Sequence, residues 1–252
     1  MASALIRASA YSLVGCINAH IRGKGWRGCW KDAAKLTVVS GVEHGGMRLV
    51  AEGQHWPGVL THSLGASMLE NVVDDRALFS RYRVFYLWGS FGYDFERRDF
   101  QPQLLFGRTV SSLGMLAIAD FDAKESFKRG IPIFQRDYVD FGNPPAGVSL
   151  FGAVMVNKKR WNDPNPLLRA INRRLILRHE VLHTLQYRRA RICNSVLDRF
   201  LYRDHNNGPV SFGQDACYLA TRPLHGPEVR AFERNMLRGI VQELRGKFGK
   251  PN

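Results

Sequence analysis

The sequence predicts an α+β protein in which a β-rich N-terminal part precedes a helical half. Between Leu36 and Val156, short apolar or alternating runs are separated by Gly, Pro, Asn and Asp, a pattern typical of strands and turns. After Trp161, apolar residues recur at helical spacing instead. With 45% hydrophobic residues, the 252-residue chain can bury a substantial core.

Residues 1–35 are expected to form either a signal or a helix. Arg7 precedes a mild apolar run that ends at Cys16, as in a bacterial lipoprotein signal, but the run is short and contains Ser9 and Ser12. An ordinary N-terminal helix and a cytoplasmic location are therefore favoured over export. No window approaches the roughly 18 unbroken apolar residues that a membrane span needs, so we expect no transmembrane helix.

The cysteines are predicted to have no structural role, because their spacing matches no zinc-finger or disulfide framework. These are Cys16, Cys29, Cys193 and Cys217.

The region 36–146 has no role that the sequence reveals, but its strands can be predicted. The expected strands are Leu36–Ser40, Met47–Glu52, Arg83–Trp88, Gly114–Ala119 and Ile131–Phe134. A further strand, Val148–Asn157, is expected at the start of a third region, residues 147–252.

A long helix is predicted over Pro166–Arg191. Asn165 and Pro166 supply a helix start, and Leu168, Ile171, Leu175, Leu182 and Leu185 then recur at helical spacing. A second helix is expected after Gly226-Pro227, with an apolar stripe of Val229, Phe232, Met236, Ile240 and Leu244.

The long helix contains the motif HExxH, formed by His179, Glu180 and His183. Residues four apart share a helix face, so both imidazoles can reach one ion while Glu180 lies beside the vacant coordination position. There, Glu180 could act as a general base toward water. The alternative interpretation is that these histidines lie on an exposed polar face of a basic helix and bind no metal.

Zinc with two histidine ligands needs a third protein ligand. Glu228, in the first turn of the second expected helix, is the first choice, and His225 is the competitor. Glu233 and His205 are more distant alternatives. Tyr187, Tyr218 and His225 are candidates to stabilise the oxyanion of a transition state.

These residues resemble a known group. His179–Gln186 reads HEVLHTLQ and Pro227–Phe232 reads PEVRAF, which is similar to the HExxHxxQ motif and later ExxA helix of small gluzincin-type zinc peptidases. The resemblance covers about residues 147–240 and implies a zincin-like metallopeptidase region. It implies zinc ligands His179, His183 and Glu228, a general base Glu180, and a peptide or protein substrate along the strand near Val148–Asn157.

A weaker resemblance points to a different third ligand. His225-Gly226-Pro227-Glu228 is similar to the HGPE segment of SprT-like metalloproteases, in which the histidine binds the metal and the enzymes act on DNA-attached proteins. Residues 158–203 hold 12 Lys and Arg against 3 Asp and Glu. This basic region could bind nucleic acid or an anionic lipid, and a solvated face is the simpler interpretation.

Two alternatives belong to other classes of protein. Thr61–Ala66 around Ser63 resembles the nucleophile elbow of lipases and esterases, and His44-Gly45-Gly46 resembles their oxyanion-hole loop. The elbow predicts an α/β-hydrolase-type serine esterase. The other alternative is a non-catalytic basic protein that binds nucleic acid or a membrane surface.

Overall fold

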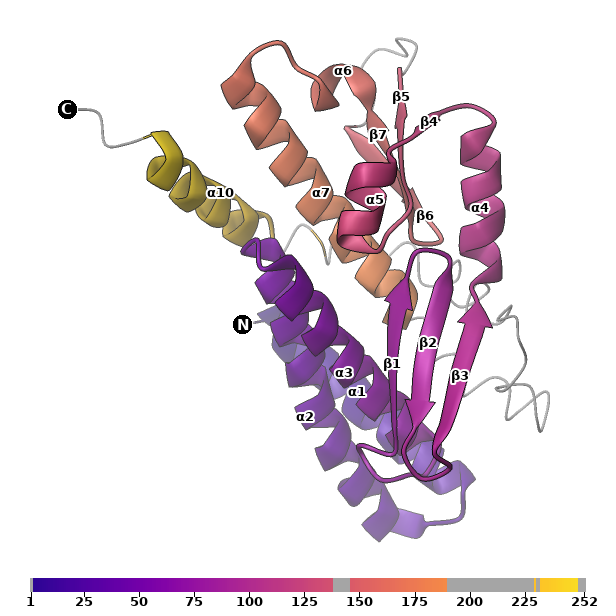
Figure 1. The fold of residues 1–252 in the computed structure, drawn as a ribbon. Coiled ribbons are helices and arrows are strands. Elements are labelled where there is room, and N and C mark those ends of the chain that lie inside the picture. The colour runs from indigo at the N-terminus through magenta and orange to yellow at the C-terminus, as the bar shows by residue number, and fades with distance from the viewer. Residues whose placement is uncertain (1, 138–145, 190–228, 230–231, 249–252) are drawn as a thin grey trace.

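The computed structural model describes residues 2–137, 146–189, 229 and 232–248 of the chain. Helices and two small β-sheets alternate along these residues, which confirms the α+β class. The N-terminal helices lie beside the first sheet, and the second sheet lies next to a long central helix (Figure 1). The order of the elements differs from the expected one at the N-terminus.

Residues 2–73 are helical. They form α1 (Ala2–Ile21), α2 (Gly25–Ala51) and α3 (His55–Val73), joined by short connections. Residues 1–35 therefore contain a helix, but the expected strands Leu36–Ser40 and Met47–Glu52 are wrong, and the region 36–146 is not β-rich in its first part.

The reason for this error is that α2 buries small and polar residues as well as apolar ones. Leu36, Val39, Glu43, Gly46 and Val50 are all buried and recur every three or four residues, as on one helix face. Because this face includes Glu43 and Gly46, the remaining apolar residues resemble short separate runs. The glycines, taken for turns, lie inside the helix.

Those glycines let α2 and α3 approach closely. A Cβ atom on Gly46 would lie 2.4 Å from the backbone nitrogen of His62, and one on Gly58 would lie 2.7 Å from the carbonyl oxygen of Gly46. Any side chain at these positions would force the helices apart.

A disulfide joins Cys16 of α1 to Cys29 of α2. The expectation that the cysteines have no structural role is therefore wrong for this pair, whereas Cys193 and Cys217 lie outside the described residues. A thioether-linked lipid on Cys16 and this disulfide exclude one another, because both use the same sulfur atom.

The first sheet contains β1 (Arg81–Tyr86), β2 (Gly89–Asp94) and β3 (Asp99–Leu104) as an antiparallel meander. The expected strand Arg83–Trp88 overlaps β1. The two faces of this sheet differ from the usual pattern, because polar side chains are buried on one face and aromatic side chains are exposed on the other. Arg83, Ser90 and Gln103 are buried on its inner face, and on the other face exposed aromatic rings stack, with Phe91 and Phe100 6.3 Å apart.

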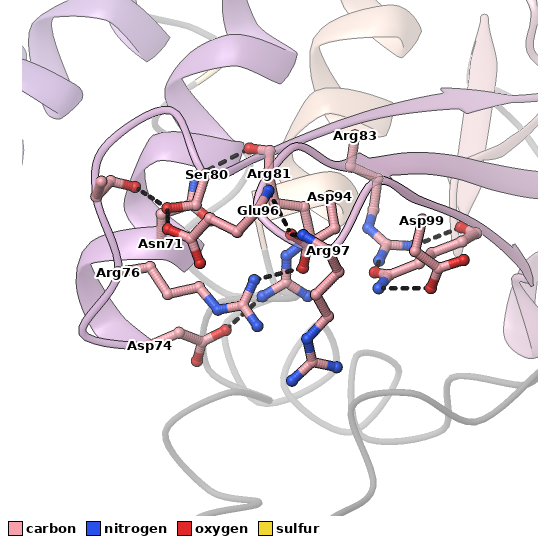
Figure 2. Close-up of polar contacts among 12 residues, drawn as sticks. Asn71, Asp74, Arg76, Ser80, Arg81, Arg83, Asp94, Glu96, Arg97 and Asp99 are labelled. Atoms are coloured by element: carbon pink, nitrogen blue, oxygen red, sulfur yellow. Dashed lines mark hydrogen bonds and ion pairs between the residues drawn. The ribbon is translucent and has the colours of Figure 1, made fainter.

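Buried and half-buried charges tie this sheet to the residues that follow α3 (Figure 2). Arg76 donates to Asp94 at 2.5 Å, and Arg81 donates to Asp74 at 2.6 Å. Although burial opposes ionisation of Asp94, the hydrogen bonds from Arg76 and from backbone amides lower its pKa. Asp94 is therefore a charged anchor at the strand end.

The next part of the chain contains α4 (Phe106–Leu116), β4 (Asp120–Phe121), α5 (Ala123–Arg129), β5 (Ile133–Arg136), β6 (Gly147–Leu150), β7 (Ala153–Asn157) and α6 (Lys158–Trp161). Its four strands form the second sheet, in the order β4, β5, β7, β6, and only β5 and β7 run parallel.

Three expected strands fall in this part. Gly114–Ala119 is wrong, because its first residues end α4, a helix that buries Arg108, Ser112 and Met115 on one face. Ile131–Phe134 overlaps β5. Val148–Asn157 is divided into β6 and β7, because the chain turns at Phe151 and Gly152, both with positive φ.

The long predicted helix is α7 (Pro166–Arg189), and the described part of the prediction is confirmed. The side-chain oxygen of Asn165 accepts hydrogen bonds from the backbone nitrogens of Leu167 and Leu168, at 2.9 and 3.2 Å, and so caps the helix. The later helix is α10 (Glu233–Phe248), and the expected apolar stripe is buried at Val229, Phe232, Met236 and Ile240.

The main core surrounds α7. Leu182 and Leu185 pack there with residues of α2, β5, β7 and α10, and Figure 1 shows α7 beside the second sheet. Among the described residues, no helix combines the length and apolarity needed to cross a membrane.

Candidate metal centre

The HExxH residues lie in the most enclosed part of α7. From Ile176 to Arg188, every residue is buried except His179 and His183, which are half-buried. The alternative of an exposed polar helix face is therefore wrong. The two histidines are the least buried residues of this stretch.

The two imidazoles lie side by side. Their ring centroids are 5.0 Å apart, and the ring planes meet at 70°. Nδ1 of His183 donates to the side-chain oxygen of Gln186 at 2.7 Å. An amide oxygen can only accept, so this hydrogen bond requires a proton on Nδ1 of His183. In the neutral ring the lone pair then lies on Nε2, the form in which imidazole binds a metal.

The side chain of Glu180, a residue of α7, lies against Gly147, the first residue of β6. Its side chain is 4% exposed, and its Oε2 atom has no hydrogen-bond partner among the described residues. Burial raises the pKa of Glu180 to about 8. The carboxyl group therefore holds a proton at neutral pH unless a cation lies near it.

Gly147 makes this arrangement possible. A Cβ atom there would lie 2.9 Å from Oε1 of Glu180 and 3.1 Å from the Cγ2 atom of Ile176. The absence of a side chain lets the backbone of β6 lie directly against the carboxyl group.

Three of the remaining candidate ligands, Glu228, His225 and His205, lie outside the described residues, and so does Tyr218. The fourth, Glu233, is the first residue of α10. Val229, the residue after Glu228, is fully buried in the same core cluster as Val181 and Leu182 of the HExxH motif. The chain therefore returns to α7 one residue after Glu228.

No other described side chain completes a metal site. Residues 2–137, 146–189, 229 and 232–248 contain no group of three His, Cys, Asp or Glu residues that could hold a metal ion. A third ligand to His179 and His183 would have to come from the rest of the chain.

Tyr187 lies in a separate buried cluster. It is fully buried with Phe85 and Leu105, and the guanidinium carbon of Arg108 lies 5.3 Å from its ring centroid. This position gives the tyrosine a clear packing role, and its role toward an oxyanion stays a prediction.

The esterase alternative has no structural basis. Ser63 lies in the interior of α3, where it is 3% exposed, and α3 follows another helix instead of a strand. His44, Gly45 and Gly46 lie inside α2 and form no loop. The strand, sharp turn and helix of a nucleophile elbow are therefore missing.

The basic region 158–203 is only partly a surface. Arg178 and Arg188 are buried, and residues 190–203 lie outside the described part. Burial lowers the pKa of Arg188 to about 9, and the charge of Arg108 acts in the same direction. Binding of nucleic acid or anionic lipid by this region stays a prediction.

Sequence reasoning did not assign roles to Gln186 and Gly147. The spacing of three residues between His183 and Gln186 is a local signal that could have shown the hydrogen bond. The contact of Gly147 with Glu180 has no such signal, because it depends on how β6 packs against α7.

Comparison of the chain with protein families, with curated proteins and with solved structures finds no match. The functional conclusion therefore depends on the residues and their geometry.

Proposed function

We propose that the protein is a zinc-dependent metallopeptidase that uses His179, His183 and Glu228 as ligands and Glu180 as general base. The observation that carries the proposal is the exposure of α7. Within a stretch that is otherwise buried, the two histidines of the HExxH motif are the only half-buried residues.

The described residues fit a zinc ion. Two adjacent imidazoles, one with its Nδ1 proton held by Gln186, are ligands that zinc prefers. The Oε2 atom of Glu180, which has no hydrogen-bond partner among the described residues, is a buried polar atom that a nearby cation and a water molecule would satisfy. When bound, zinc would supply Lewis acidity toward water and a substrate carbonyl.

Glu180 would move the proton. Beside a bound cation the carboxyl group would be ionised, so it could accept a proton from the attacking water and deliver it to the leaving amine. Because Glu180 lies against Gly147, this proton transfer would occur at the start of β6.

β6 would orient the substrate. Among the described residues it is an edge strand, since it pairs only with β7. An extended peptide can add to such an edge through backbone hydrogen bonds, which would lay the scissile bond across α7 near Glu180. This arrangement is the one that the zincin-like expectation requires.

The first test is the metal content of the purified protein, measured by elemental mass spectrometry. We expect about one zinc per chain, lost in His183→Ala and retained in Ser63→Ala, because Ser63 belongs to the rejected esterase site. Absence of zinc after reconstitution would contradict the proposal.

Glu180→Gln tests the general base. The variant should retain zinc, and hydrolysis of a peptide library should fall by about 10²- to 10⁴-fold, since the amide cannot accept the proton. Loss of zinc from this variant would contradict the assigned role of Glu180.

The third ligand can be tested by a pair of variants. Glu228→Ala should weaken zinc binding more than His225→Ala, as measured by competition with a chelator. The reverse result would move the third ligand to His225.

A further inference from the structure

A pocket lies on the opposite side of α7 from the histidines. It has a volume of about 290 Å³, and α7 contributes Arg173, Arg174, Leu177, Arg178 and Val181 to its wall. With 3.6 residues per turn, these residues lie about half a turn around the helix from His179 and His183. The pocket is therefore separate from the candidate metal centre.

The pocket is positively charged. Arg129 of α5 joins the three arginines of α7, and the acidic residues of the wall are Glu125 and Glu243. Four guanidinium groups against two carboxylates leave a formal charge of +2. His55 adds no charge at neutral pH, since burial is the main cause that lowers its pKa to about 4.

The arginines are held in place by neighbouring elements. Arg178 donates to the carbonyl oxygens of Ala51 and Met236 at 3.3 and 3.2 Å, and it also pairs with Glu243. A Cβ atom on Gly53 would lie 2.4 Å from its Nη2 atom. The guanidinium group of Arg178 is thus closely packed between the end of α2 and the start of α10.

The other two arginines of α7 are fixed as well. Arg174 donates to Glu243 at 2.7 Å, and Arg173 donates to the carbonyl oxygen of Trp161 at 2.7 Å with its guanidinium carbon 5.1 Å from the Trp161 ring centroid. Fixed guanidinium groups lose little entropy when they bind a ligand.

Several donors of these groups are left over. Arg129 uses only Nε, which donates to Glu125 at 3.0 Å, and its Nη atoms form no hydrogen bond with the described residues. Nη1 of Arg173 and Nη2 of Arg174 likewise form no hydrogen bond with the described residues. These are the donors that bind the oxygens of an anion in pairs.

The wall also has an apolar side. Val50, Leu177, Val181 and Trp161 line it. The volume is near the lower end of the range for small-molecule pockets, about 300 to 1,000 Å³. Such a pocket suits a small organic group that carries one doubly charged anionic head.

We propose that this pocket binds a small phosphate monoester, with the phosphate on Arg129, Arg173 and Arg174 and the organic part against the apolar wall. Two negative charges on the phosphate match the formal charge of the pocket. The site is independent of zinc, because none of its residues is a candidate ligand.

The test is isothermal titration calorimetry on the full chain with two probes, glycerol 3-phosphate and inorganic phosphate, at constant ionic strength. The monoester should bind saturably and several-fold more tightly than inorganic phosphate. Equal affinities would overturn the assigned organic part, and no saturable binding of either probe up to about 10 mM would overturn the site.

Charge variants test the location. Arg129→Gln should weaken binding of the monoester by about 10-fold or more, as expected for the loss of a charge-assisted hydrogen bond. Glu125→Gln should tighten binding, because it removes a negative charge from the wall. Weaker binding in Glu125→Gln or unchanged binding in Arg129→Gln would contradict the proposal.

Arg48→Gln is the matched control. Arg48 of α2 pairs with Glu52, four residues away at the end of that helix, as Arg129 pairs with Glu125 on α5. Arg48 does not line the pocket. Its variant should bind the monoester like the natural chain. An equal loss of affinity in Arg48→Gln would show that the effect of Arg129 is one of overall charge.

Discussion

Gln186 orients one of the two histidines on which the metal proposal depends. Its side-chain oxygen accepts the Nδ1 proton of His183, and this leaves Nε2 with the lone pair. Gln186→Ala should lower zinc affinity by about 10- to 100-fold, as measured by chelator competition, while His183 itself is retained.

An exposed glutamine is the control for this prediction. Gln54, in the connection between α2 and α3, is exposed, so Gln54→Ala should leave zinc affinity unchanged. If Gln186→Ala binds zinc as tightly as the natural chain, the hydrogen bond has no part in metal binding.

His55 should make the stability of the protein depend on pH. Burial, together with the charge of Arg129, lowers its pKa to about 4, although the hydrogen bond from Nε2 to the carbonyl oxygen of Arg129 favours the charged ring. Below about pH 6.5 the unfolded chain therefore binds a proton that the folded chain does not.

The free energy of unfolding should fall by up to ~3 kcal/mol between pH 6.5 and pH 4 because of this one residue. His55→Gln should remove that part of the slope, measured as the difference between the two proteins in urea denaturation at several pH values. Parallel slopes would show that His55 titrates normally in the folded protein.

At the scale of elements, the close contact of α2 and α3 depends on particular glycines. A Cβ atom on Gly46 would lie 2.4 Å from the backbone of His62, whereas one on Gly45 would have no atom of another element within 4 Å. Gly46→Ala should lower the free energy of unfolding by about 2–4 kcal/mol.

Gly45→Ala is the matched control and should have the opposite sign. It should raise stability by about 0.5–1 kcal/mol, because alanine favours a helix interior over glycine. The same loss in both variants, measured by urea denaturation, would indicate that helix packing is not the cause.

The disulfide between α1 and α2 should also contribute to stability. It closes a loop with a sequence separation of 13 residues, so Cys16→Ser should lower the free energy of unfolding by about 3 kcal/mol. Reductant should bring the natural chain to the level of the variant and leave the variant unchanged. A natural chain that is insensitive to reductant would mean that this bond is not formed.

Local patterns predicted some elements well. The start of α7 was predictable because Asn165 and Pro166 act within one helical turn. The division of Val148–Asn157 into β6 and β7 was not, because the apolar run continues through the turn at Phe151 and Gly152.

At the scale of the whole molecule, the sequence predicted the class but not the N-terminal architecture. Strand prediction for residues 36–52 depended on glycines and β-branched residues being used in turns and strands. Here Gly46 serves a contact between two helices, which is a long-range property that no local window contains.

Some features of the candidate site were likewise predictable from local sequence, and others were not. His179, Glu180 and His183 could be found because their relation is a spacing of one helical turn. The position of Gly147 against Glu180 and the pocket between Arg129 and Arg173 depend on separate elements meeting in space. These contacts could be found only from the three-dimensional structure.

The length of β6 has a consequence for how strongly any peptide could bind along it. The strand contains four residues, Gly147–Leu150, and only alternate residues point their backbone groups toward the open edge. An added peptide would gain about two to four hydrogen bonds, each worth roughly 0.5–1.5 kcal/mol net. Backbone pairing alone would therefore support dissociation constants near the millimolar range, so tight or selective substrates would have to be recognised through their side chains.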